Sequence, residues 1–110
     1  MKITITKKYT LIKPAEISLD LFLEKLVKDF SKFDGKHLIL DFSEKINTKI
    51  EELLLFLRLS SQHKKNGTSF VIISRGINID KIPEELNVVP TFTEATDILE
   101  MDAIERDLGF

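Results

Sequence analysis

Cysteine is missing from this chain of 110 residues, and so is tryptophan. The absence of cysteine excludes disulfide bonds, zinc sites built from thiolates and thiol nucleophiles. Histidine is almost as scarce, because only His37 and His63 are present and neither belongs to an H-x-H or H-E-x-x-H motif. Zinc hydrolase chemistry needs such a spacing, so we predict no metal site in this chain.

Glycine is also rare and never clustered. The four glycines, Gly35, Gly67, Gly76 and Gly109, are isolated and are typical of helix stops or turns. A Gly-rich phosphate-binding loop is therefore lacking, which excludes the Rossmann and P-loop classes. No G-x-S-x-G elbow marks a serine nucleophile, and paired carboxylates are adjacent in sequence rather than spaced to converge. We expect no cofactor and no catalytic residue, hence a protein that is not an enzyme.

Long apolar stretches are missing too. No apolar run approaches the roughly 20 residues that a membrane-spanning helix requires. The first residues, MKITITKK, contain no continuous apolar segment of the kind found in signal peptides. We therefore expect a cytoplasmic protein without membrane contact, and the length suits one domain over residues 1–110.

The most informative segment is a long stretch in the middle of the chain. An apolar run over residues 37–42 predicts a strand that is covered on both faces. A polar loop and a helix follow; Thr48 begins a capping box with Glu51 at the third helical position, and Asn66-Gly67 ends the helix. A second apolar strand over residues 69–74 completes a βαβ unit, in which the two strands are parallel.

The flanking segments add further elements. Alternating apolar residues on either side of Lys7-Lys8 predict a hairpin, and Ser18 caps an amphipathic helix. The segment from Ile77 to Leu86 is expected to hold one short helix, with Pro83 as a candidate start. A last strand is expected at residues 87–89 and a capped helix at Thr91. Together these elements predict an α/β fold whose mixed sheet has about four to five strands, with helices packed on it.

Charge is distributed unevenly, although the formal net charge is only -2. The segment from Glu84 to Phe110 holds eight acidic residues and one basic residue, Arg106. Such a segment would repel phosphates, so we expect no nucleic acid among the partners. Its acidic helix is either a solvated face or a docking surface for a basic partner.

The loop after the first buried strand is the candidate site. In an open parallel sheet, ligands and partners meet the loops at the carboxyl ends of the strands, and this loop leaves such an end. Its candidate partner-binding residues are Ser43, Asn47, Thr48, Glu51 and Glu52, in the loop and the first helical turn. These residues either only form turns and caps or make up a contact surface for another protein.

The helix that follows this loop carries more apolar residues than one buried face needs. Ile50, Leu53, Leu54 and Leu57 form one stripe, and Leu55, Phe56 and Leu59 widen it. Either neighbouring helices flank it on two sides, or part of the surplus is a protein interface, for example in a homodimer.

The order of these elements resembles that of a STAS domain, the module named for sulfate transporters and anti-sigma factor antagonists. The corresponding segments are LILDF (38–42), the helix from Lys49 to Gly67, FVIIS (70–74) and TFTEA (91–95). The resemblance covers most of the chain and rests on the order and spacing of the elements. It implies a STAS-like fold and a regulatory function through protein–protein interaction.

One part of the STAS pattern is absent. Soluble antagonists of this family carry D-S-[ST]-G at the start of the long helix, where a partner kinase phosphorylates the serine. In this chain Lys49 to Glu52 occupy that place and contain no serine. The resemblance therefore implies partner binding without this phosphorylation switch, with Glu51 as a permanent charge at the same place.

The run EMDAIERDLGF also resembles the ends of small bacterial chains that carry the label ribonuclease Z. Members of that nuclease family are far longer and need an H-x-H-x-D-H metal motif, which this sequence lacks. The sequence thus predicts a non-enzymatic module that binds another protein through residues 43–52. The alternatives are a small-ligand or nucleotide sensor, and an accessory protein associated with ribonuclease Z that has no nuclease metal site.

Overall fold

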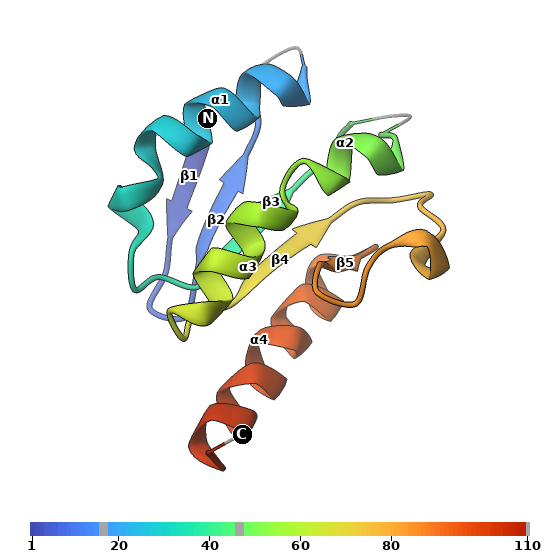
Figure 1. The fold of residues 1–110 in the computed structure, drawn as a ribbon. Helices are drawn as coiled ribbons and strands as arrows, with labels where there is room; N and C mark the ends of the chain where they lie inside the picture. Colours follow the sequence, from blue (N-terminus) through green and yellow to red (C-terminus); the bar gives the residue numbers. More distant parts are fainter. Residues whose placement is uncertain (16–17, 46–47, 110) are drawn as a thin grey trace.

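The computed structural model describes residues 1–15, 18–45 and 48–109, and within them it contains a five-stranded sheet in the order β1-β2-β3-β4-β5 (Figure 1). β1 (Lys2–Ile5) and β2 (Thr10–Lys13) form an antiparallel hairpin. The remaining neighbours are parallel: β2 with β3 (Leu38–Asp41), β3 with β4 (Phe70–Ile73), and β4 with β5 (Asn87–Val89). The predicted α/β fold with a mixed sheet is confirmed.

The turn between β1 and β2 forms without the glycine or asparagine that tight hairpins favour. The backbone N–H of Thr6 donates to the carbonyl of Tyr9 at 2.9 Å, and Thr6 Oγ1 accepts the N–H of Tyr9 at 3.0 Å. Lys7 and Lys8 lie exposed at the tip of the turn. The threonine hydroxyl therefore closes the predicted hairpin, because it supplies the hydrogen bond that orders the turn.

Three helices cover one face of the sheet, which we call the first face: α1 (Leu19–Asp29), α2 (Ile50–Leu54) and α3 (Leu57–Lys65) (Figure 1). Alternate strand residues point toward them, because successive side chains of a strand lie on opposite faces. At the centre, Phe22, Phe42 and Phe56 are fully buried, with ring centroids 5.4 to 6.0 Å apart. Each buried ring contributes about 1.5–3 kcal/mol of hydrophobic free energy, so this trio holds α1, β3 and the α2–α3 junction together.

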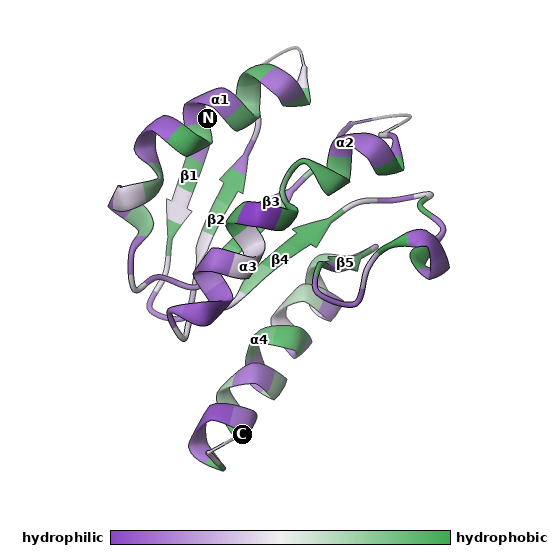
Figure 2. Ribbon diagram, viewed as in Figure 1, coloured by the Kyte–Doolittle hydropathy of each residue, from purple (hydrophilic) through white to green (hydrophobic). Residues whose placement is uncertain are grey.

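One helix, α4 (Phe92–Asp107), covers the opposite, second face. Its residues Ala95 and Leu99 pack against Ile39 and Val71, which are fully buried. The helix begins as predicted, since Thr91 Oγ1 accepts the N–H of Glu94 at 3.1 Å. Figure 1 shows its C-terminal end projecting beyond the strands, and Figure 2 shows that β4, which is covered on both faces, is hydrophobic throughout.

The connections between parallel strands all lie on the first face. α1 joins β2 to β3, α2 and α3 join β3 to β4, and the segment from β4 to β5 packs Ile77, Ile82 and Leu86 into the first-face core. From β2 onward, each new strand is added on the same side of the strand before it. Because crossovers between parallel strands are right-handed, every connection then lies on the same face of the sheet. The second face is therefore left to α4.

The long helix predicted between β3 and β4 is interrupted. At the junction of α2 and α3 the N–H of Phe56 donates to the carbonyl of Leu53 at 3.0 Å, which is the tighter spacing of a 3-10 turn. Both of these side chains are fully buried, whereas Leu54 and Leu55 are 37% and 44% exposed. Of the apolar residues that widen this helix in the sequence, some are therefore buried in the core and others are exposed at the surface.

The short helix predicted within residues 77–86 is present, but its predicted start at Pro83 is wrong. A 3-10 helix, η2 (Ile79–Lys81), lies earlier, and Asn78 Oδ1 accepts the N–H of Asp80 at its start, at 3.1 Å. Pro83 instead begins a turn that is closed by the N–H of Leu86. Leu86 is buried in the core at the end of this turn, and the chain then enters β5.

The remaining helix ends follow the sequence closely. Ser18 Oγ accepts the N–H of Leu21 at the start of α1, and η1 (Phe30–Phe33) continues that helix. The radius of gyration is 13.1 Å, close to the roughly 13 Å expected of one domain of this length. Among the described residues, no helix combines the length and the apolar character that crossing a membrane would require.

Candidate functional site

The carboxyl ends of the parallel strands meet at one edge of the sheet, and those predicted contact residues that the structure describes lie at or beside this edge. β2 ends at Lys13 and β3 at Asp41. The register pairs Ile12 with Leu40, so the next step along both strands sets Lys13 beside Asp41. The first polar contact of the site therefore follows directly from parallel strand pairing.

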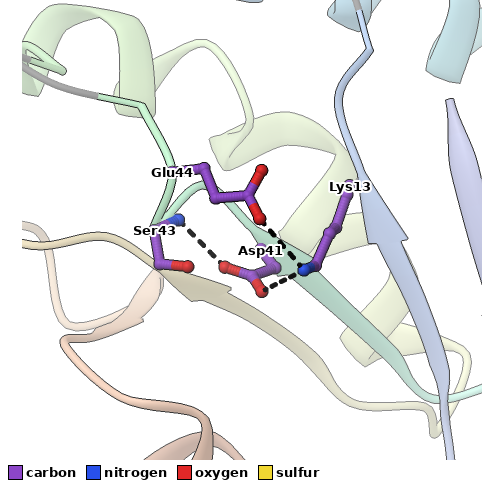
Figure 3. Close-up of polar contacts among 4 residues, drawn as sticks. All are labelled: Lys13, Asp41, Ser43 and Glu44. Atoms are coloured by element: carbon purple, nitrogen blue, oxygen red, sulfur yellow. Dashed lines mark hydrogen bonds and ion pairs between the residues drawn. The ribbon is translucent and has the colours of Figure 1, made fainter.

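Lys13 is held between two carboxylates (Figure 3). Its Nζ lies 3.8 Å from Asp41 Oδ2 and 3.4 Å from Glu44 Oε1. The side chain of Asp41 is 11% exposed and that of Glu44 is 80% exposed, so Asp41 is the fixed member and Glu44 the outer one. Exposed ion pairs contribute at most about 1 kcal/mol, and we infer that this group positions the loop more than it stabilises the domain.

The start of the loop is fixed by its backbone. Asp41 Oδ1 accepts the N–H of Ser43 at 2.9 Å, and the N–H of Lys45 donates to the carbonyl of Phe42 at 3.0 Å. Beside this turn lies a hollow of about 200 Å³, lined in part by Lys13, Pro14 and Glu44. Pockets for small molecules usually exceed about 300 Å³, so the hollow suits a single side chain of a partner better than a whole ligand.

The capping box predicted at Thr48 is wrong by one residue. The structure places Lys49 before α2, and Glu52 at the third helical position, where Glu51 was expected. Glu52 Oε1 accepts the N–H of Lys49 at 2.9 Å, as a capping carboxylate does. The hydroxyl of Thr48 is buried and has no hydrogen-bond partner among the described residues. Glu52 therefore caps α2, and the Thr48 hydroxyl is turned away from solvent.

The other predicted contact residues differ in accessibility. Glu51 is exposed in the first turn of α2, and Ser43 is half-buried at the end of β3. Asn47 lies outside the described residues. The structure thus brings Ser43 and Glu44 to the rim of the sheet and presents Glu51 outward from the helix that follows.

An exposed stripe on α2 extends the predicted surface. Leu54 and Leu55 come three and four residues after Glu51, so the three exposed side chains lie on the same side of α2 and its C-terminal cap. Leu53, between them, is buried. Arg58 follows at the start of α3 and is also exposed. We call residues 43–45 and 48–52 with Leu54 and Leu55 the α2 surface; it combines the exposed side chains of these two leucines with polar neighbours of both charges.

A second polar cluster lies at the opposite edge, where the parallel strands begin. Ser69 Oγ donates to Asp102 Oδ2 at 2.7 Å, and the backbone N–H of Ser69 donates to His37 Nδ1 at 3.0 Å. Arg106 Nη1 donates to Ser69 Oγ at 3.4 Å. His37 therefore contacts the backbone of Ser69 and not its hydroxyl, which differs from the geometry of a serine nucleophile and its base. Ser69 is also only 1% exposed, so the cluster fastens α4 to the sheet.

The pKa of each histidine is lower than the ordinary value for this side chain. Burial, followed by the positive charge of Arg106, lowers the pKa of His37, although Asp102 opposes the shift. The ring of His63 lies against Phe30 and Phe70, with centroids 5.3 and 6.2 Å away. Burial lowers the pKa of His63 as well, while the bond between Nε2 and the carbonyl of Lys36 opposes it.

Lys64 is the third group with a shifted pKa, and it lies at the same edge as the histidines. Burial lowers the pKa of its ammonium group, although the charges of Asp102 and Glu85 oppose the change. Its Nζ donates to the carbonyl of Glu85 at 2.6 Å. Lys64 therefore joins the end of α3 to the segment before β5.

Two residues of the site were missed by sequence reasoning. Lys13 and Glu44 were not among the candidate contact residues named from the sequence. The register of a parallel pair would have placed Lys13 beside Asp41, but that register is fixed by packing on both faces and not by local sequence. Glu44 follows from the turn that Asp41 and Ser43 form.

Within the described residues, no group of three or more histidine, aspartate or glutamate side chains converges as a metal site.

Comparison with known proteins adds no assignment. A scan against protein-family models finds no match for this chain, and neither does a search of curated proteins.

Proposed function

We propose that this chain is a non-enzymatic protein-binding module of regulatory type, and that its partner docks on the α2 surface. The observation that carries the proposal is the exposure of Leu54 and Leu55, at 37% and 44%, beside a loop whose start is fixed by Lys13 and Asp41. Protein interfaces commonly place apolar anchors inside a polar rim. The STAS resemblance leads to the same segment of the chain.

The arrangement also favours a protein over a small ligand. The hollow at the loop holds about 200 Å³, below the usual size of a ligand pocket. The strand order does not reverse anywhere in the sheet, so the crevice in which doubly wound folds bind nucleotides is not formed. A surface of fixed loop, short helix and exposed leucines is suited to a complementary apolar pocket on another protein.

Photo-crosslinking tests this proposal at single-residue resolution. A benzoylphenylalanine at position 55 should give a discrete crosslinked partner in lysate of the native cells. The matched control is the same label at Val27, which is 54% exposed on α1 near the opposite edge of the sheet. Position 55 tests the site better than Thr48 or Glu52, because the Thr48 hydroxyl is buried and the Glu52 carboxylate caps α2.

The second arm of the experiment introduces Glu51→Lys into the chain labelled at position 55. Glu51 is exposed and its side chain forms no hydrogen bond or ion pair with the other described residues, so circular dichroism should be unchanged while the crosslink is lost. Equal products from positions 55 and 27, or none from either, would refute the placement of the interface. A crosslink only to a second copy of the chain would identify the surface as a homodimer interface instead.

A further inference from the structure

A groove on the second face shares only His37 and Arg106 with the polar cluster around Ser69. It lies between α4 and the β1–β2 turn and encloses about 580 Å³. Its apolar wall contains Tyr9, Leu99 and Ala103, and its rim contains Lys7, Lys8 and Arg106. The α2 surface lies at the other end of the strands and on α2, so the two sites are separate.

The groove exists because α4 presents small side chains toward the hairpin. Thr96, Leu99 and Ala103 recur at intervals of three and four residues and therefore share one side of the helix. Leu99 still packs on the sheet, but Ala103 is exposed because its single methyl group does not reach the hairpin. The opposite wall is fixed, since the ring of Tyr9 meets that of Phe92 edge to face at 5.6 Å.

Positive charge is concentrated at this groove, although α4 is otherwise acidic. Arg106 is the only basic residue between Glu84 and Phe110, and it lies on the groove side of an otherwise acidic helix. Lys7 and Lys8 reach the same rim from the hairpin. Within the part of the chain that the structure describes, none of these three cations forms an ion pair. Glu100 is the one acidic residue of the lining.

The hydrogen bonding of Arg106 supports a fixed positive charge at the groove. Its Nη1 is directed to Ser69 Oγ, 3.4 Å away, and Ser69 is itself bonded to Asp102. His37 also lines the groove, and the charge of Arg106 contributes to the lowered pKa of this histidine. The lining therefore carries three cations and a neutral imidazole at neutral pH, opposite the carboxylate of Glu100. Asp102 adds a second carboxylate outside the lining, at the Ser69 hydroxyl that Arg106 also contacts.

We propose that this groove binds a small amphipathic anion, an alkyl carboxylate of medium chain length. The alkyl body would lie against Tyr9, Leu99 and Ala103, and the carboxylate would lie between Arg106 and the two lysines. The volume falls within the range of about 300–1,000 Å³ that is usual for small-molecule sites with apolar walls and few polar groups. The site is distinct from the proposed protein interface and does not depend on it.

The test compares three probes with the same tail and different head groups: octanoate, 1-octanol and octylammonium. Each is titrated into the full chain, and binding is followed by amide chemical shifts. Octanoate should shift the amides of residues at the groove, such as Tyr9 and Ala103, and should bind more tightly than octanol. Octylammonium binding as tight as octanoate binding, or shifts spread evenly over the molecule, would overturn the proposal.

Variants separate the charge of the groove from its shape. Arg106→Gln and Lys8→Gln should each weaken octanoate binding roughly two- to five-fold, as expected for exposed ion pairs. Glu100→Gln should strengthen it by a similar factor, because it removes the opposing charge. Ala103→Leu should abolish binding, since the larger side chain fills the space while leucine preserves the helix.

The matched control is Lys2→Gln, which removes an exposed lysine of β1 outside the groove and should leave octanoate affinity unchanged. Thermal melts of all variants confirm that the fold is retained. An Ala103→Leu chain that melts like the parent and still binds octanoate would refute the site. Loss of binding in Lys2→Gln equal to that in Lys8→Gln would show a general charge effect and refute it as well.

Discussion

Acidification from pH 7.5 to 5.5 should destabilise this domain, because His37 and His63 have lowered pKa values in the folded chain. The unfolded chain then binds more protons than the folded chain, so stability is present at high pH and falls as the pH drops below about 6.5. The structural cause is direct at His37, whose Nδ1 accepts the N–H of Ser69 and cannot do so once protonated. Protonation also adds a positive charge near Arg106.

The size of the effect has a clear upper limit. A histidine that titrates only in the unfolded chain changes the free energy of unfolding by about 1.4 kcal/mol between pH 7.5 and 5.5. Both histidines together therefore account for at most about 2.7 kcal/mol. The actual loss is smaller than this limit, because His37 is partly exposed and solvent screens its charge. Domains of this kind are stable by about 5–15 kcal/mol, so a loss of about 1 kcal/mol is still measurable.

Urea unfolding at pH 7.5, 6.5 and 5.5, followed by circular dichroism, measures this dependence. His37→Gln keeps an acceptor for the N–H of Ser69 without a titrating group, and it should remove part of the pH dependence. His63→Gln should remove another part but should also lower stability at pH 7.5, because the imidazole packs between Phe30 and Phe70. Stability that is constant over this range, or a full pH dependence in the double variant, would refute the reasoning.

Three further substitutions test the fold by urea unfolding at pH 7.5. Phe56→Ala should cost about 3–5 kcal/mol, because it empties the fully buried centre of the first-face core; a cost below that of a surface change would contradict this packing. Thr91→Ala should cost about 1 kcal/mol through loss of the cap on Glu94, and Thr93→Ala serves as its exposed control. Gly67→Ala should cost about 1–2 kcal/mol from its φ of +83° alone, since no atom lies within 4 Å of the added methyl group; an unchanged stability would exclude this backbone strain.

The strands were the most predictable part of this chain. β3 and β4 are covered on both faces, so their near-continuous apolar runs are visible in the sequence, and the hydroxyl caps at Ser18 and Thr91 mark their helices. These signals are local, because each depends on residues within a few positions of one another. The structure places them where they were expected.

The errors arose where tertiary packing outweighed local sequence. The capping pattern at Thr48 is present in the letters, but the buried position of its hydroxyl leaves the cap to Lys49 and Glu52. The interruption at Phe56 leaves no trace in the spacing, because Leu53 and Phe56 are three residues apart and would also share one face of an unbroken helix. Neither effect can be read from spacing alone, and both lie in or beside the candidate site.

The order of the sheet has a consequence for how this chain folds during synthesis. Every strand after β1 pairs with the strand that precedes it, so the partner of each strand has already been synthesised when that strand emerges. The first-face core can form as soon as β5 has emerged, since all of its helices come earlier in the chain. Until α4 follows, Ile39, Val71 and Ile73 remain open to solvent on the second face. A nascent chain at this stage displays one finished core and one bare apolar sheet, and that sheet is the surface on which a chaperone would act.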